Sequence, residues 1–302
     1  MNTSFQVPRG VIAPLLTPFD EDYSVATDLY VAHARRLLDT GCVALAPFGT
    51  TGEALSVGID ERLKAIRALV DGGIDPGRMI PGTGLSNVAD TARLSRGCLE
   101  MGCTAVMTLP PFYYKGVSED GLYSYFAQLI AAVGTDARIF LYHIPPIAIV
   151  GIPPSLAARL HRNFPTQIVG IKDSSGDWEN TRALLEIDGL IVYPGSELPL
   201  LDALDLGSPG CISATANINC TAIGQVVELF DRGEKDAAHA LHAEVAQFRK
   251  VVQEYAPIPA QKRLLAESTG DARWARVRPP LTAMSEEKGR ALNAALAAIR
   301  ES

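Results

Sequence analysis

Short apolar runs alternate with amphipathic stretches along nearly the whole chain, and this alternation constrains the fold more than any other feature. Apolar, partly β-branched runs suit strands that are buried on both faces, and apolar residues recurring every three or four positions suit helices packed on such a sheet. A strand followed by a helix, repeated, predicts a parallel sheet with helices outside it. The expected strands are residues 11–16, 43–47, 79–82, 105–109, 138–142, 168–172, 190–193 and 210–214.

Helical patterns follow these runs in turn, so the fold class is expected to be α/β. Eight strand–helix units within about 230 residues favour a closed (β/α)8 TIM barrel, and a doubly wound open sheet is the alternative. The expected helices are residues 26–38, 60–70, 87–100, 119–133, 154–162, 178–186, 198–206 and 222–231.

No linker rich in proline, serine or glycine divides the 302 residues. Helical patterns continue beyond the eighth unit at 234–254, 260–267 and 286–299. We therefore expect a barrel over residues 1–232 and a helical extension over 233–302 that packs on it.

The composition, 47% hydrophobic and 20% charged, is that of an ordinary globular protein. The net charge of −7 argues against nucleic acid or an anionic membrane as a partner, but it leaves a small anionic substrate open. The 5 cysteines lack CxxC spacing and are expected to be free, buried thiols. With no signal-peptide pattern and no apolar run of membrane-spanning length, the expected location is a reducing cytoplasm.

One lysine ends a predicted buried strand, in the stretch "IVGIKDSS". Lysine is rarely buried unless it is paired. Lys172 therefore either reaches solvent, pairs with Asp173, or has surroundings that change its chemistry. An inward-pointing lysine in a barrel strand loses hydration, which favours the neutral amine. A neutral amine attacks carbonyl groups to form a Schiff base, and the strand end is where barrels carry their chemistry.

Other strand ends carry hydroxyl groups. Thr50 and Thr51, in "FGTTGE", could hold a small carboxylate with help from backbone N–H groups, or the stretch is a plain glycine turn. Tyr142, in "FLYHIPP", could move a proton near an amine and a carbonyl, or it is a core residue. His239 and His242 are spaced as HxxH, but the pair has no third ligand in register, so no metal site is predicted.

Six short motifs lie at the strand ends and in the C-terminal segment, in this order along the chain: "GTTGE", "PPFYYK", "YHIP", "GIKD", "GCISATAN" and "RPPL". In these the chain resembles the dihydrodipicolinate synthase / N-acetylneuraminate lyase superfamily of class I aldolases, over roughly residues 8 to 300. The resemblance implies that Lys172 forms a Schiff base with pyruvate or another 2-oxo acid. It implies that Thr50 and Thr51 bind the adjacent carboxylate and that Tyr142 relays protons.

The same resemblance implies further site residues and an assembly. Tyr114 would reach into a neighbouring subunit's site and join Thr50 and Tyr142, and the backbone carbonyl of Ile212 would line the pyruvate pocket. The implied protein is a homotetramer, a dimer of dimers, that needs no metal or other cofactor.

The substrate half beyond pyruvate departs from known members. The lysine-pathway synthases that this chain resembles have an arginine after the fifth strand that binds the carboxylate of the second substrate. This chain has Ile147 at the matching position, so a carboxylate on the second substrate would lack its partner. In "GSEL", Gly195 and Glu197 retain part of a substrate-binding loop, but Leu198 replaces an acidic residue of sialic acid lyases. The expected second substrate is a less polar aldehyde.

The predicted function is a lyase that makes or cleaves the C–C bond next to a lysine-bound 2-oxo acid, as an aldolase of the 4-hydroxy-2-oxo acid or 2-keto-3-deoxy acid type. Dihydrodipicolinate synthase and a 2-keto-3-deoxy sugar acid dehydratase are the alternatives within this chemistry. A non-catalytic 2-oxo acid binding protein is the alternative from another class. A phosphate-binding barrel enzyme is disfavoured because "PGSE" and "TAN" lack glycine-rich turns.

Overall fold

The computed structural model describes residues 6–300 and divides into two compact units. The first comprises residues 75–212 with the few residues before Val11, and the second comprises residues 11–74 and 213–302. Strands and helices alternate in both units, which confirms the predicted α/β class.

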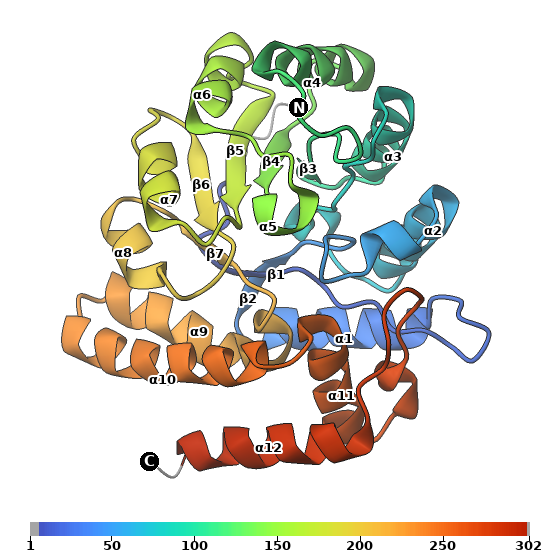
Figure 1. Ribbon diagram of the computed structural model, residues 1–302, viewed down its shortest axis with the longest axis vertical. Coiled ribbons are helices and arrows are strands. Elements are labelled where there is room, and N and C mark those ends of the chain that lie inside the picture. The colour runs from blue at the N-terminus through green and yellow to red at the C-terminus, as the bar shows by residue number, and fades with distance from the viewer. Residues whose placement is uncertain (1–5, 301–302) are drawn as a thin grey trace. The chain divides into compact units, whose positions relative to one another are not determined.

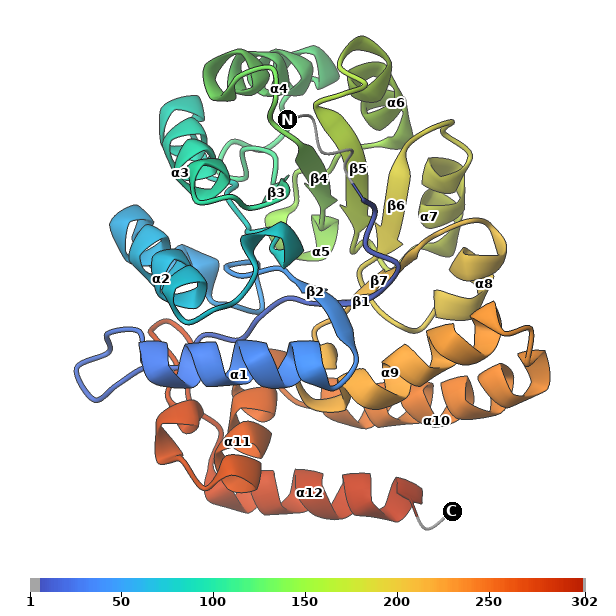
Figure 2. The same cartoon turned by 180° about the vertical axis from the view of Figure 1, so that it is seen from behind.

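The first unit is built on a parallel sheet in the order β3-β4-β5-β6, with α3, α4, α6 and α7 along its outer face (Figures 1 and 2). Side chains in the loops begin several of these helices: Ser118 Oγ accepts from Gly121 N at 3.1 Å, and Asn87 Oδ1 accepts from Asp90 N at 2.8 Å. The elements are η2 (Pro76–Arg78), α3 (Val88–Glu100), β3 (Val106–Thr108), α4 (Glu119–Val133), β4 (Ile139–His143), α5 (Pro145–Ala148), α6 (Pro154–Asn163), β5 (Ile168–Asp173), α7 (Trp178–Leu185), β6 (Ile191–Pro194), α8 (Leu200–Asp205) and β7 (Gly210–Ile212).

The expected strand at 79–82 is wrong as a full strand. It is reduced to isolated bridge residues at Met79 and Gly82. Gly82 pairs in parallel with Met107, with hydrogen bonds from Met107 N to Pro81 O at 2.8 Å and from Thr83 N to Met107 O at 2.9 Å. Pro81 accepts a ladder bond but has no N–H to donate one, so the regular pattern is interrupted there. The single-turn helix α5, which begins with Pro145, was not expected from the sequence.

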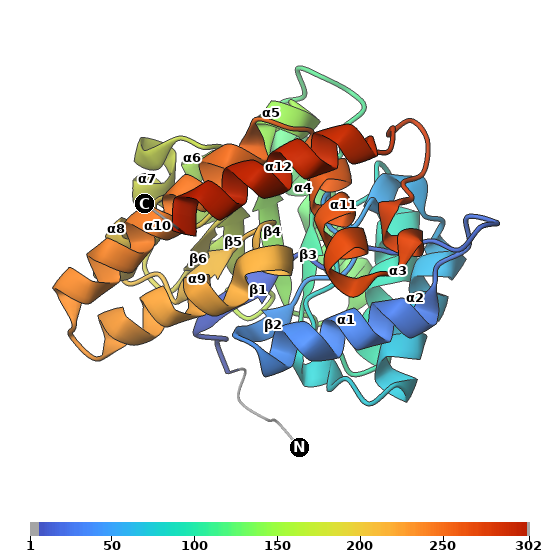
Figure 3. The ribbon, with the colours of Figure 1, turned by 90° about the horizontal axis from the view of Figure 1, so that it is seen from below.

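The second unit pairs β1 with β2 in parallel and covers them with helices. Figure 3 shows α10, α11 and α12 lying together within this unit. Its elements are β1 (Gly10–Ala13), α1 (Thr27–Asp39), β2 (Cys42–Leu45), η1 (Ala54–Ser56), α2 (Ile59–Asp71), α9 (Ala216–Asp231), α10 (Lys235–Gln253), α11 (Pro257–Thr269), η3 (Ala272–Ala275) and α12 (Glu286–Arg300).

The C-terminal helices share one apolar core. Val252 of α10, Ala260 and Leu264 of α11, and Leu292 of α12 are buried together. A second cluster joins α11 to the segment after β1 through Leu16, Leu265, Ala266 and Trp274. The C-terminal helices thus belong to the same compact unit as β1 and β2. The expected boundary between residues 232 and 233 stays a prediction.

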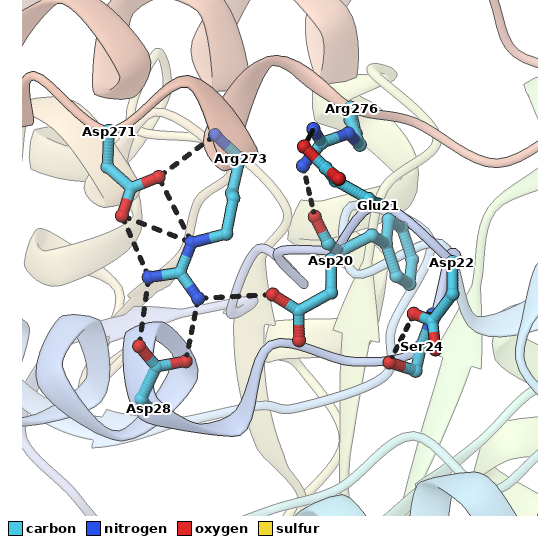
Figure 4. A network of polar contacts seen from close by, with 9 residues as sticks. Asp20, Glu21, Asp22, Ser24, Asp28, Asp271, Arg273 and Arg276 are labelled. Carbon is cyan, nitrogen blue, oxygen red and sulfur yellow. Dashed lines mark hydrogen bonds and ion pairs between the residues drawn. The ribbon is translucent and has the colours of Figure 1, made fainter.

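Charged side chains fasten η3 to the loop that precedes α1 (Figure 4). The Arg273 guanidinium contacts Asp20 at 3.1 Å, Asp28 at 2.9 Å and Asp271 at 2.8 Å. The hydrogen bonds from Arg273 hold the pKa of Asp28 and of Asp271 below their usual values.

All five cysteines are free and buried, as predicted. Within residues 6–300, none of the helices has the length and apolar character needed to cross a bilayer.

Candidate active site

Lys172 is the fifth residue of β5, a strand whose six residues are all buried. Lys172 is only 4% exposed, so nearly all of its surface is removed from solvent. In the parallel sheet it stands in register with Tyr142 of β4 and with Tyr193 of β6. Residues in register on neighbouring strands project to the same face, so β5 brings the lysine between two tyrosines.

Tyr142 is the partner of this amine. Lys172 Nζ donates to Tyr142 Oη at 3.3 Å, and the same nitrogen lies 4.4 Å from the centre of the Tyr142 ring. The tyrosine is itself 3% exposed. Tyr193 turns its hydroxyl away, because Tyr193 Oη donates to the carbonyl of Pro8. The amine and a phenol that could exchange a proton with it are therefore adjacent in a buried place.

Asp173 is not an ion-pair partner of Lys172. Its carboxylate accepts hydrogen bonds from Ser175 N at 2.9 Å, Asn180 Nδ2 at 3.0 Å and Thr181 Oγ1 at 2.7 Å. These three donors fix the turn after β5 and the start of α7, so the pairing of Lys172 with Asp173 that the sequence left open does not occur.

His143 follows Tyr142 as the last residue of β4, where strand alternation turns it to the opposite face. Its Nδ1 accepts from Ile152 N at 2.7 Å, which fixes the loop after α5. Burial lowers the pKa of His143, with the Asp173 carboxylate opposing that shift. Neutral His143 is a structural residue at this edge of the sheet.

The loop after β6 comes close to the end of β5. Gly195 N donates to Asp173 O at 2.5 Å, and a Cβ at Gly195 would lie 2.0 Å from Ser174 Oγ. Only glycine fits this approach. Glu197 is fully buried in the same loop, and Leu198 is 37% exposed.

Three further predicted residues lie in the same unit. Ile212 ends β7 and is fully buried. Ile147 lies on α5 and is 62% exposed, and Tyr114 lies in the loop between β3 and α4 with 71% of its surface exposed. The Tyr114 ring packs edge-on against Tyr113, with the ring centres 5.5 Å apart. The structure thus pairs Lys172 with Tyr142, whereas Tyr114 points outward.

Thr50 and Thr51 are half-buried in the loop after β2, within the second unit. This loop is tightly wound: Gly52 N donates to Gly49 O at 3.1 Å, and Glu53 N donates to Thr50 O at 3.1 Å. The segment after β1 passes close to Gly52, where a Cβ would lie 2.7 Å from Leu15 O. Only glycine therefore fits at this position of the loop. The stretch "GTTGE" is therefore a shaped loop rather than a loose turn.

Sequence reasoning missed the role of Asn217, in the motif "GCISATAN". Asn217 Oδ1 accepts from Leu16 N at 3.0 Å and bonds His33 Nε2 at 3.0 Å, and Asn217 Nδ2 donates to Pro14 O at 3.0 Å. One amide therefore fastens the end of β1 to the start of α9. The motif was the available signal, but the partners lie about 200 positions away along the chain.

Within residues 6–300, no three histidine, cysteine, aspartate or glutamate side chains gather in a way that could hold a metal ion. The chemistry that these residues can carry is that of a buried amine with a phenol beside it.

A buried lysine next to a tyrosine, at the carboxyl ends of parallel strands flanked by helices, defines a class I, Schiff-base lyase of the (β/α)8-barrel class. The family model of the dihydrodipicolinate synthetase family matches residues 7–299. The chain therefore belongs to this family, and the predicted family and enzyme class are confirmed.

Individual relatives agree along the whole chain. It is 34% identical over 292 residues to a protein of Chloroflexus aurantiacus named "Uncharacterized DapA-like lyase", covering 95% of this chain and 96% of the relative. It is 30% identical over 290 residues to a 4-hydroxy-tetrahydrodipicolinate synthase of Listeria monocytogenes, covering 95% and 97% of the two chains.

Solved structures give the fold. The crystal structure of dihydrodipicolinate synthase from Agrobacterium tumefaciens has a TM-score of 0.88 at 34% identity, with 96% of this chain and 99% of that chain covered. A 2-keto-3-deoxygluconate aldolase variant of Sulfolobus solfataricus has a TM-score of 0.87 at 22% identity over 97% of this chain and 96% of that one, which supports the fold alone. The (β/α)8 class with additional C-terminal helices is thereby confirmed.

Proposed function

We propose that Lys172 forms a Schiff base with pyruvate or a related 2-oxo acid, and that the enzyme makes or cleaves the adjacent C–C bond with Tyr142 as the proton relay. The observation that carries this proposal is the 3.3 Å contact between Lys172 Nζ and Tyr142 Oη in a buried setting. The family membership supports the reaction class.

The chemistry follows from these two groups. The neutral amine of Lys172 adds to the keto carbon, and loss of water gives an iminium ion. This cation withdraws electrons and stabilises a carbanion at the next carbon, so the bond from that carbon to a hydroxyl-bearing carbon can break or form. The phenol of Tyr142 gives its proton to the hydroxyl that leaves as water, and the resulting phenolate then takes the proton of the departing alcohol, or returns it when the bond forms.

Thr50 and Thr51 are proposed to hold the carboxylate of the 2-oxo acid, and the carbonyl of Ile212 to line its pocket. The closely wound loop of Gly49–Ala54 supports the first assignment, because backbone N–H groups and two hydroxyls in one loop suit a small anion. Gly195 and Glu197 are proposed to belong to the part of the site that receives the second substrate.

The second substrate is proposed to be a neutral aldehyde rather than one with its own carboxylate. Ile147 is apolar, and Lys115 in the neighbouring loop donates to the carbonyls of Phe112 and Ala148, at 3.1 Å for the latter. We therefore favour cleavage of a 4-hydroxy-2-oxo acid or a 2-keto-3-deoxy acid. The Listeria monocytogenes relative is named a 4-hydroxy-tetrahydrodipicolinate synthase, which keeps dihydrodipicolinate synthase as a competing activity. A 2-keto-3-deoxy sugar acid dehydratase is the other, because the same iminium ion can lose water instead of an aldehyde.

The assembly is proposed to be a homotetramer, a dimer of dimers, in the cytoplasm. Tyr113 and Tyr114, 74% and 71% exposed, support an interface with a second copy, because large aromatic side chains are enriched at such surfaces. The five free, buried cysteines support a reducing compartment.

A panel of substrates tests the function. We would measure pyruvate release from 4-hydroxy-2-oxo acids of increasing polarity, the dehydrated 2-oxo acid from 2-keto-3-deoxy sugar acids, and condensation of pyruvate with an aldehyde that carries a carboxylate. The proposal expects pyruvate release from acids with a neutral aldehyde half, and loss of this release in Lys172→Ala. Preference for the carboxylate-bearing aldehyde would contradict the proposed substrate, and Ile147→Arg should move the enzyme toward that aldehyde.

A further inference from the structure

A second lysine, outside the catalytic pair, is buried completely. Lys262 of α11 donates from Nζ to Glu53 Oε1 at 2.6 Å, and both side chains are fully buried. Glu53 is the last residue of the motif "GTTGE", directly after the loop that carries Thr50 and Thr51. An ion pair joins residues 209 positions apart, inside one compact unit.

The other carboxylate oxygen of Glu53 is occupied as well. Arg278 N donates to Glu53 Oε2 at 2.8 Å, and Arg278 is the arginine of the motif "RPPL". Its guanidinium reaches past the loop, donating to Ser56 O at 2.8 Å and pairing with Glu61. The motif "RPPL", which no step of the chemistry uses, thus meets the motif "GTTGE" at one carboxylate.

The backbone at Glu53 shows what this carboxylate holds in place. Glu53 has φ +55°, in the left-handed region where a side chain other than glycine is uncommon. Its N–H donates to Thr50 O at 3.1 Å, which closes the turn that contains both threonines. Thr17 Oγ1, in the segment after β1, donates to Gly52 O at 2.8 Å. The loop is therefore held by Thr17 through Gly52 and by the C-terminal segment through Glu53.

A fully buried ion pair is a weak source of stability, because the loss of hydration offsets most of the attraction. What such a pair does provide is a fixed geometry, since a buried carboxylate with one donor on each oxygen, Lys262 Nζ and Arg278 N, has one favourable position. We propose that Glu53, Lys262 and Arg278 are positioning residues that orient the Thr50–Thr51 loop, and so set the enzyme's selectivity for substrates with a carboxylate next to the reacting carbonyl. This inference rests on the proposed role of the two threonines.

Burial lowers the pKa of Lys262 to about 8, although the Glu53 carboxylate opposes the shift. The charged groups that face this amine are Glu53 and Arg278, and its nitrogen lies 4.4 Å from the centre of the Phe19 ring. The ion pair is therefore complete below about pH 8 and loses its cation above that pH.

Carboxylate selectivity tests the inference. The ratio of trapping rates with borohydride is measured for pyruvate against pyruvamide, its neutral analogue, in the wild type and in Lys262→Met. The second variant, Lys262→Met with Glu53→Gln, removes both buried charges and keeps an acceptor for Arg278 N. It covers the case in which the single variant fails to fold. Arg232→Met, which breaks an exposed pair with Glu234, is the matched control.

We expect the preference for pyruvate over pyruvamide to fall about tenfold or more in the Lys262 variants and to stay unchanged in Arg232→Met. A merely structural role would lower trapping of both compounds together and leave their ratio unchanged, and that result would overturn the inference. If the wild type forms no adduct with pyruvate, the proposed function itself fails. The two failures are therefore distinguishable.

Discussion

Removal of one oxygen atom tests the proposed proton relay. Tyr142→Phe keeps the ring whose centre lies 4.4 Å from Lys172 Nζ, and it deletes only the hydroxyl that accepts from that nitrogen at 3.3 Å. The lost hydrogen bond is long, so its effect on folding should be about 1 kcal/mol or less. A positioned acid–base group contributes about 10²- to 10⁴-fold to a rate, or about 3 to 5 kcal/mol in the activation barrier. We therefore expect kcat for pyruvate release to fall by that factor.

The assay separates the proton relay from the amine. Steady-state cleavage gives kcat, and the adduct trapped after long incubation with pyruvate reports on Lys172, which Tyr142→Phe leaves in place. Tyr193→Phe is the matched control, because Tyr193 is also buried and in register with Lys172 but donates to Pro8 O. Tyr193→Phe should retain kcat. A Tyr142→Phe enzyme with kcat within about threefold of wild type would refute the relay.

Three further predictions concern the frame around the site. Because Arg36 can only donate to His33 Nδ1, at 3.2 Å, His33 is neutral with its proton on Nε2, and burial lowers its pKa to about 3. Below about pH 6.5 His33 gains a proton in the unfolded chain but not in the folded one, so the free energy of unfolding falls as the pH falls. Between about pH 6.5 and 5, urea unfolding should show that His33→Gln loses about 2 kcal/mol less unfolding free energy than the wild type. An equal fall in unfolding free energy for both proteins would contradict the neutral state assigned to His33. Gly195→Ala should destabilise by about 1–3 kcal/mol, measured by thermal unfolding, with partial recovery in Ser174→Gly; no change would contradict the close approach. Asp173→Ala should cost about 1–3 kcal/mol in unfolding free energy, because three donors lose their acceptor. Lys172 should still form a trapped adduct with pyruvate in this variant, and loss of the adduct would make Asp173 a partner of the amine.

Much of the fold follows from local pattern. The period of apolar residues predicts α4 at residues 119–133, as observed. Lys172 could be predicted to be buried and inward-facing because β5 is short, apolar and bounded by a turn. The expected strand at 79–82 failed because Pro81 interrupts the ladder, although proline there was visible in the sequence.

The contacts that shape the site could not be predicted in the same way. Glu53 and Lys262 meet only after α11 has packed, and nothing in the amphipathic pattern of α11 distinguishes a buried lysine from an exposed one. Asn217 likewise finds its partners at the end of β1. Such pairs depend on tertiary packing, so one sequence gives the residue types but not their partners.

The most direct measurement is to reduce the protein with borohydride in the presence of pyruvate and locate the modified residue by peptide mass spectrometry. We predict one adduct per chain on Lys172, with the mass of one pyruvic acid less one oxygen, and no adduct in Lys172→Ala. Lys262 should carry none, because its amine is fully buried and paired with Glu53. An adduct on Lys262 or on another lysine, or no adduct at all, would contradict the assignment of Lys172 as the Schiff-base residue.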